Sequence, residues 1–456
     1  MKRYYLFSLL FMVLFSMNGF AQESNQKSVS VTVYNNNLGV VKDVRSIKIA
    51  KGTSTIKLTD VAQRIDPTSV HIKLNGEVLE QNYQYDLVSI GKILNKYLDK
   101  KIQLVSNKGE LIEGTLLASY SSQIVLRKKN GGLLMLPNSN DYKISVDKLP
   151  DGLITKPTLV WMVNSESAGT QDVEVSYQTE GMGWHAEYVA VLNKDDTNLD
   201  LNSWVSIENR CGTTFKNAKL KLIAGDVHRA KAQRYNRGYD DEVYMSVAKS
   251  SAPQFQEKEF FEYHIYNLQR PTTLRNNETK QVSLFEASGI KAKKYYYYKS
   301  GSYYRNNTNG KVAVIIEFEN TKANNLSIPM PKGKVRVYKS DGNAIEFIGE
   351  DFINHTPRNE KVKVKIGKAF DVLVKEVEKN NRRISQNVRE MDYEITVTNR
   401  KKEDIVVDVE RALGRDWEIL KSSLKYKKLN SSNILFKVPV KADSKTVLKY
   451  SVRYVR

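Results

Sequence analysis

The chain has 456 residues and carries 71 Lys and Arg against 51 Asp and Glu, a formal net charge of +20. Its single cysteine, Cys211, excludes an intramolecular disulfide, which a chain of this length does not need for stability. After residue 21 no run reaches eighteen consecutive apolar residues, so we expect no transmembrane segment.

The N-terminal segment has the three parts of a secretory signal peptide. A basic start and an apolar run over residues 2–17 precede the small residues Gly19 and Ala21, which mark a cleavage site before Gln22. A buried N-terminal helix is the alternative. We expect residues 1–21 to be removed on export, which makes the protein periplasmic or associated with the cell surface. Because Gln22 and not a cysteine follows the cleavage site, we do not expect a lipoprotein.

Residues 28–85 alternate between apolar and polar side chains in short runs, which is the pattern of β-strands. The strands expected there are 29–34, 40–49, 53–58 and 69–74. Asn75-Gly76 follows the last of them and favours the positive φ angles of a hairpin turn. We therefore expect a small N-terminal β domain over residues 28–85.

Residues 86–150 begin with a helix and continue with short strands. Ser89 is a suitable N-cap for a run of apolar residues at helical spacing, Ile90, Ile93, Leu94, Tyr97 and Leu98. The strands expected next are 101–106, 111–118, 123–129, 132–137 and 143–148. Gly114 lies in mid-strand, where a barrel strand would bend. The segment predicts a helix plus a small SH3-like or Sm-like β-barrel.

The rest of the chain also predicts β structure, so the expected fold class is mainly β. Strands are expected at 158–163, 172–177, 185–192, 199–207, 219–223, 260–268, 281–285, 311–318, 333–338, 361–366, 393–397, 405–409, 434–438 and 446–455. The alternation stops over residues 226–258, which predicts a mobile loop. The spacing of the strands predicts two β-sandwich (Ig-like) units, a central one over 156–370 and a C-terminal one over 371–456.

Trp184 follows the glycine turn Gly181-Met-Gly183 and begins a strand-like run. Alternate residues of that run, Trp184, Ala186, Tyr188 and Ala190, share one face of the strand. We interpret Trp184 as an anchor of the central core, and a ligand-stacking residue is the alternative.

Several stretches together resemble a known bacterial family. They lie at residues 37–41, 66–70, 176–188, 224–226, 263–274, 276–280 and 367–372. On these stretches the chain resembles proteins that carry the domain of unknown function 4139, a group that includes mucoidy-inhibitor-like proteins. The resemblance implies an exported, β-rich envelope protein and supplies no catalytic residues. The chain departs from the mucoidy-inhibitor pattern because the predicted small barrel stands in place of a long charged coiled coil.

No catalytic or metal-binding motif is complete in this sequence. The five histidines lack metal-ligand spacing, and the pattern S-x-x-K occurs at four places without its companion motifs. We therefore expect no cofactor, no metal and no catalytic residue, and a non-enzymatic binding or scaffold protein of the envelope. The alternative is an envelope hydrolase of polysaccharide or peptide with carboxylates in a β-sandwich cleft, because such a pair is defined by its separation.

Two basic segments are candidates for a ligand surface, the loop 226–258 and the segment 291–305, in which cations alternate with tyrosines. Such side chains bind anionic groups and stack on sugar rings or lie at a membrane interface. The candidate residues are Arg229, Lys231, Arg234, Arg237, Lys291, Lys293, Lys294, Tyr295, Tyr297 and Arg305.

The expected partner of these segments is an anionic envelope polysaccharide or lipid. We expect no nucleic acid as partner, because an exported protein does not meet it, and the oligomeric state is left open. In the alternative interpretation residues 291–305 form an exposed hairpin with tyrosines chosen for strand propensity, and the positive charge keeps a large β protein soluble.

Overall fold

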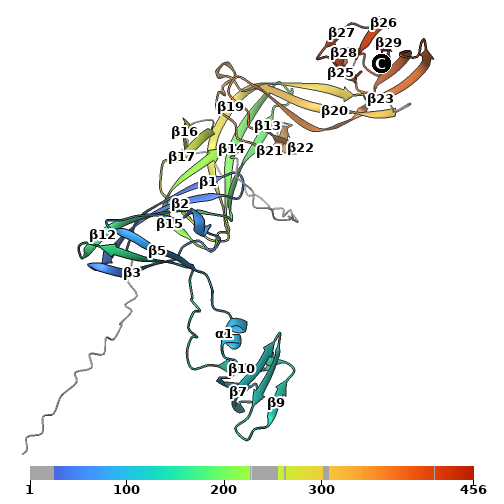
Figure 1. The fold of residues 1–456 in the computed structure, drawn as a ribbon. Helices are drawn as coiled ribbons and strands as arrows, with labels where there is room; N and C mark the ends of the chain where they lie inside the picture. Colours follow the sequence, from blue (N-terminus) through green and yellow to red (C-terminus); the bar gives the residue numbers. More distant parts are fainter. Residues whose placement is uncertain are drawn as a thin grey trace, which may run out of the picture. The chain divides into compact units, whose positions relative to one another are not determined.

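The computed structural model describes residues 25–225, 227, 255–260, 263–300, 308–341, 344–414 and 416–455. The predicted signal peptide and most of the predicted loop 226–258 lie outside these residues. Within them the protein is mainly β, with one α-helix and three short 3-10 helices (Figure 1). None of the described helices is long and apolar enough to cross a membrane.

Two compact units divide the chain, and the polypeptide passes between them more than once. The first comprises Met1–Val31, Val40–Glu180 and Arg210–Ala218. The second comprises Thr32–Gly39, Gly181–Asn209 and Lys219–Arg456. This division cuts through the predicted central domain 156–370, because strands distant in sequence pair within each unit.

The first unit contains a three-stranded sheet in the order β3-β11-β5 and, separately, strand β12 between β2 and β4. Its elements are β2 (Gly39–Ile49), β3 (Gly52–Thr59), η1 (Pro67–Ser69), β4 (His71–Lys73), β5 (Glu77–Gln84), β11 (Thr158–Ser165) and β12 (Gly169–Thr179), after β1 (Asn25–Tyr34). The predicted hairpin at Asn75-Gly76 is wrong, because β4 and β5 belong to different sheets. Both strands pair instead with partners more than seventy residues away, β12 and β11.

The predicted small domain begins with the predicted helix, α1 (Ile90–Lys96). The Ser89 side chain accepts a hydrogen bond from Lys92 N at 3.4 Å, which confirms the N-cap. Five strands follow in the sheet order β10-β6-β7-β8-β9. Their bounds, with one 3-10 helix, are β6 (Lys101–Ser106), β7 (Leu111–Tyr120), β8 (Gln123–Arg127), β9 (Leu133–Leu136), η2 (Ser139–Asp141) and β10 (Tyr142–Ser145).

The core of this small domain explains its sequence pattern. Helix α1 contributes Leu94, its C-cap residue Tyr97 packs there too, and the strands contribute alternate residues such as Ile102 and Leu126. At Gly114 a Cβ atom would lie 2.9 Å from the Arg127 carbonyl oxygen of β8, so the residue is a glycine because β7 and β8 approach closely there.

The second unit begins with a sheet of order β22-β21-β13-β14-β19, in which β13 and β21 run parallel. Its elements are β13 (Met182–Leu192), β14 (Asn198–Asn209), the part of β15 (Phe215–Ala224) from Lys219 onward, β16 (Phe255–Phe260), β17 (Tyr263–Leu268), β18 (Thr272–Leu274), η3 (Lys322–Asn324), β21 (Gly333–Ser340) and β22 (Ile345–Ile353). Strand β16 pairs with β17, so residues 255–258 belong to a strand and the predicted loop ends earlier than expected.

The prediction that Trp184 lies in the core is confirmed. Its side chain is 2% exposed, its Nε1 donates to Ile223 O at 3.1 Å, and its ring meets Tyr266 edge-on at 6.1 Å. The hydrogen bond satisfies the one polar atom of the indole, so burial of the side chain leaves no unpaired donor.

Three long strands lead from this sheet into a C-terminal β-sandwich (Figure 1). They are β19 (Glu278–Lys299), β20 (Thr308–Glu319) and β23 (Lys361–Arg383), and register shifts in β20 allow them to bend. The sandwich also contains β24 (Val388–Asn399), β25 (Ile405–Ala412), β26 (Trp417–Ser422), β27 (Tyr426–Lys428), β28 (Asn433–Val440) and β29 (Ser444–Val455). Two ladders, β23-β24-β29-β26 and β19-β25-β28-β27, pack around one core.

That core extends beyond the predicted C-terminal unit 371–456. It includes Tyr296, Tyr298 and Val312, which the prediction placed in the central domain. The predicted boundary between residues 370 and 371 falls inside β23. A strand that serves two cores carries one continuous alternating pattern, so the pattern contains no signal for the boundary.

Candidate ligand-binding surface

The run of four tyrosines in β19 divides between the two faces of the strand. Tyr296 and Tyr298 are buried in the core of the C-terminal sandwich. Tyr295 and Tyr297 point to the other face, where each is half-buried. Two of the tyrosines therefore stabilise the core, and only the other two, Tyr295 and Tyr297, can contact a ligand.

Neighbouring strands extend this outer face. Tyr295 lies opposite Ile315 of β20, which lies opposite Lys365 of β23. Tyr297 lies between Ala313 of β20 and Asp408 of β25. We call this surface the tyrosine–lysine face and define it by Lys293, Tyr295, Tyr297, Lys299, Ala313, Ile315, Glu317, Lys363, Lys365, Asp408, Glu410 and Lys437.

The phenol groups of the face remain protonated and neutral over the ordinary pH range. Burial, helped by the charges of Glu317 and Asp408, raises the pKa of Tyr295 to about 12. Burial also raises the pKa of Tyr297, and the hydrogen bond from its hydroxyl to Glu410 adds to the effect. The two rings thus offer neutral aromatic surface with a fixed orientation.

Cations and carboxylates alternate around the two rings. Glu410 also accepts from Asn433 at 2.9 Å and lies 3.5 Å from Lys299, and Asp408 lies 3.3 Å from Lys437. These surface pairs contribute little to stability, because water screens them. Their effect is to leave ammonium groups at the rim of an aromatic surface.

The other predicted ligand residues are placed as follows. Lys291 and Lys293 are exposed on β19. Lys294 points away from the tyrosine–lysine face and pairs with Asp196, which also pairs with Lys339. The remaining candidates lie outside the described residues: Arg229, Lys231, Arg234, Arg237 and Arg305.

Sequence reasoning missed the residues that other strands bring to the face. Asp408 and Glu410 lie more than one hundred residues from Tyr297 and reach it through the parallel pairing of β25 with β19. The strict alternation Lys-Val-Lys-Val-Lys over residues 361–365 does indicate a strand with one lysine face. It does not indicate which strand will pair with it.

Carboxylates in the core are held by arginines in the described parts of both units. Asp43 Oδ2 accepts from Arg45 Nη2 at 2.8 Å in the first unit. In the second unit Glu376 pairs with Arg411 and accepts from Ser300 Oγ at 2.6 Å. Among the described residues no group of three or more His, Cys, Asp or Glu side chains is arranged to hold a metal ion.

A comparison with known protein families shows to which family the chain belongs. The family described as "Domain of unknown function (DUF4139)" matches residues 173–453, more than half of the chain. The chain belongs to this family. No curated protein matches it. The matched region contains the whole tyrosine–lysine face, whereas the small domain at 86–150 precedes it.

Proposed function

We propose that this DUF4139 protein is exported and binds an anionic polysaccharide of the cell envelope, without catalysis, on the tyrosine–lysine face. The observation that carries the proposal is the pair of neutral, oriented rings of Tyr295 and Tyr297 between exposed lysines. Sugar rings stack on aromatic faces, and ammonium groups attract the carboxylates or phosphates that such polymers carry.

A hydrolytic function has less support from the described residues. A hydrolase of polysaccharide needs two carboxyl groups at a defined separation, one of them held protonated by its surroundings. The core carboxylates Asp43 and Glu376 belong to different units, and each forms an ion pair with an arginine of its own unit. The carboxylates of the face likewise form ion pairs with lysines.

Binding to a polyuronate tests the proposal. The chain from Gln22 onward is titrated with polygalacturonate and with dextran, a neutral polysaccharide, and heats of binding are measured. We expect binding to polygalacturonate alone, weakened but retained in part as the Debye length falls from about 10 Å at 0.1 M salt to about 3 Å at 1 M. The part that persists at high salt is the contribution of ring stacking.

Matched variants connect the binding to the face. Tyr295→Ala combined with Tyr297→Ala is expected to weaken binding about tenfold, because each aromatic contact contributes roughly 0.5–1.5 kcal/mol. The control is Tyr85→Ala combined with Tyr120→Ala, which removes two exposed tyrosines of the first unit. Equal binding by both double variants, or equal binding of the two polysaccharides, would exclude the proposed function.

A further inference from the structure

The edge strand β9 of the small domain exposes apolar side chains to solvent. Leu133 is 58% exposed and Met135 is 70% exposed, while Leu136 on the opposite face packs into the core. A strand at the end of a sheet ordinarily carries polar residues on its outer face, because a bare apolar edge invites unwanted contacts. Strand β9 is apolar on both faces, so its outer face is suited to a contact.

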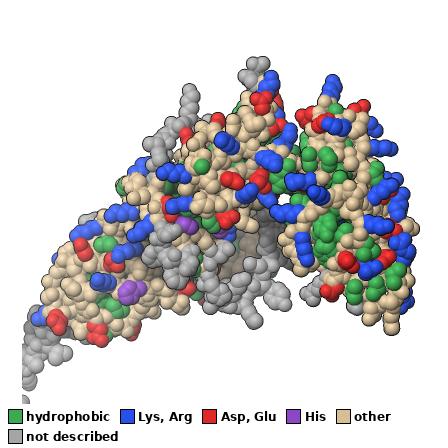
Figure 2. Space-filling model, turned by 90° about the horizontal axis from the view of Figure 1, so that it is seen from above, with side chains coloured by type: hydrophobic (Ala, Val, Ile, Leu, Met, Phe, Trp, Pro, Cys, Tyr) green, Lys and Arg blue, Asp and Glu red, His purple; other side chains and the backbone are tan. Residues whose placement is uncertain are grey.

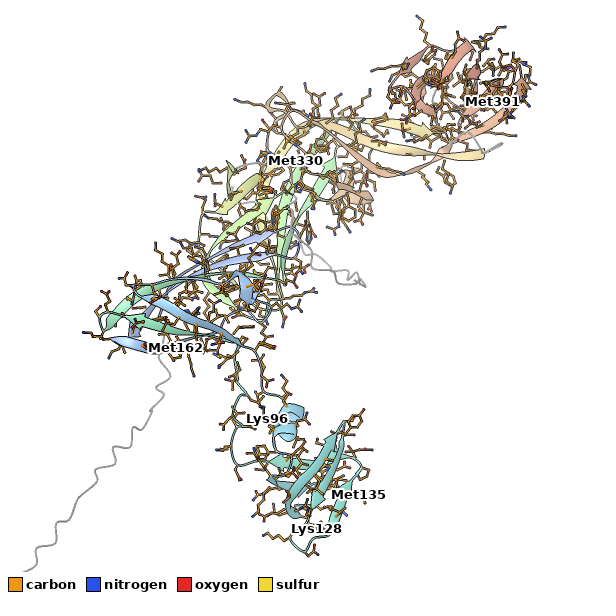
Figure 3. The ribbon with its side chains drawn as sticks, in the orientation of Figure 1. Lys96, Lys128, Met135, Met162, Met330 and Met391 are labelled. Carbon is orange, nitrogen blue, oxygen red and sulfur yellow. The ribbon has the colours of Figure 1, made fainter. Side chains whose placement is uncertain are left out.

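Cations lie directly beside these apolar residues. Met135 is opposite Val125 on β8, and Leu133 is opposite Arg127. The turn that follows β8 carries Lys128 and Lys129, both exposed. Figure 3 shows Lys128 and Met135 at the end of the small domain away from Lys96 on α1. We call the surface formed by Val125, Arg127, Lys128, Lys129, Leu133 and Met135 the β8–β9 edge.

The charge of the β8–β9 edge is positive. Lys129 pairs with Glu113 at 3.2 Å, a contact between exposed side chains that water screens. In the described part of the chain Arg127 and Lys128 form no ion pair. An apolar strip with unneutralised cations at its side matches the boundary between the headgroups and the acyl chains of an anionic bilayer.

A second copy of the chain is a poorer match to this edge. A strand of four residues is about 14 Å long at about 3.4 Å per residue, so pairing two such edges covers far less than the about 800 Å² per partner of a stable interface. A lipid surface needs no such continuous area, since each inserted side chain and each cation contributes independently.

We propose that the β8–β9 edge docks the small domain on an anionic phospholipid surface. Leu133 and Met135 enter the interface, and Arg127 and Lys128 contact the headgroup phosphates. The proposal involves other residues than the polysaccharide site and does not depend on it.

Flotation with vesicles tests the docking. The chain from Gln22 onward, which keeps every residue described by the structure, is mixed with vesicles of phosphatidylcholine or with vesicles of which about one third is phosphatidylglycerol. We expect it to float with the anionic vesicles and to remain in solution with the neutral ones. Equal behaviour with both vesicle types would overturn the proposal.

Two variants and two controls assign the binding to the edge. Leu133→Ser combined with Met135→Ser, and Arg127→Gln combined with Lys128→Gln, are each expected to weaken vesicle binding about tenfold. The matched controls are Ile90→Ser, which removes an exposed apolar residue of α1, and Lys425→Gln combined with Lys427→Gln in the C-terminal sandwich. Loss of binding in the controls to the same extent would refute a localised site.

A fluorescent probe reports insertion directly. Cys211 is fully buried, so a cysteine introduced by Met135→Cys is the one that an environment-sensitive dye will label. We expect its emission to shift to the blue and rise with anionic vesicles, whereas the same dye on Phe370→Cys, at a position 94% exposed, stays unchanged. An unchanged signal at position 135 would contradict insertion.

Sedimentation distinguishes lipid from a second copy. If the wild-type chain sediments as a dimer that the Leu133→Ser, Met135→Ser variant separates, and vesicles bind both proteins equally, the occupant is another copy and the lipid proposal fails. Polysaccharide binding is expected to be unaffected by the edge variants. The failure of one proposal is therefore separable from the failure of the other.

Discussion

Ser300 follows directly on the last residue of β19 and is buried. Its hydroxyl donates to Glu376 and accepts from Arg411, whose guanidinium lies 4.4 Å from the centre of the Tyr393 ring. These contacts anchor the inner face of the strand in the core. Because alternate residues must then point outward, the anchor orients Tyr297 on the other face, where its hydroxyl meets Glu410.

Trp184 is the residue whose removal should damage the central core most clearly. Trp184→Ala is expected to lower the free energy of unfolding by about 3–5 kcal/mol, since it leaves a cavity and removes the hydrogen bond to Ile223 O. Trp184→Phe keeps most of the volume and should lose only about 1 kcal/mol. Denaturant unfolding measures both, and an unchanged midpoint for the alanine variant would contradict the core role.

At the element scale, the sequence predicted individual helices and strands better than it predicted which strands pair. The helix at residues 90–96, with its cap at Ser89, follows from a local pattern and is present. The separation of β4 from β5, and the contact of β25 with β19, depend on strands brought together from distant parts of the chain. Local propensity contains no information on such pairings, so Asp408 and Glu410 could not be assigned to the tyrosine–lysine face.

Asp196 forms ion pairs with lysines of two other elements of the second unit. It lies in the turn between β13 and β14 at a φ of 59°, and it pairs with Lys294 of β19 and Lys339 of β21. Partial burial disfavours its charged form, but the two lysines outweigh this effect and lower its pKa. The pairs therefore stabilise the fold above the ordinary pKa of 3.8 and lose that effect as the pH falls through the lower folded value.

Asp196→Asn is accordingly expected to cost about 1 kcal/mol of unfolding free energy at pH 7. The difference between variant and wild type should shrink as the pH falls below 3.8 and through the lower folded pKa, because Asp196 then takes up a proton and loses its charge. Denaturant unfolding at several pH values measures it. A difference that is the same at neutral and acid pH would show that the ion pairs are not its cause.

Lys and Arg residues are spread along the whole sequence. Figure 2 shows Lys and Arg side chains across the visible face with Asp and Glu side chains between them. The net charge of +20 therefore attracts anionic surfaces at long range, while specific contacts depend on local arrangements such as the tyrosine–lysine face and the β8–β9 edge. The proposed polysaccharide partner is a polymer of the cell envelope, so that function requires export, whereas anionic phospholipid surfaces also face the cytoplasm.

We predict that the protein is exported and loses residues 1–21 on the way. The sequence of residues 1–21 predicts cleavage before Gln22, and the new N-terminal glutamine would be free to cyclise to pyroglutamate. Intact mass measurement of the protein from the envelope fraction of its own host is expected to match a chain that begins at residue 22. Changing Ala21→Asp, which places a charge where the cleavage site needs a small residue, should leave the uncleaved form. A native protein that retains residues 1–21 would contradict this prediction and remove the reason to expect contact with envelope polymers.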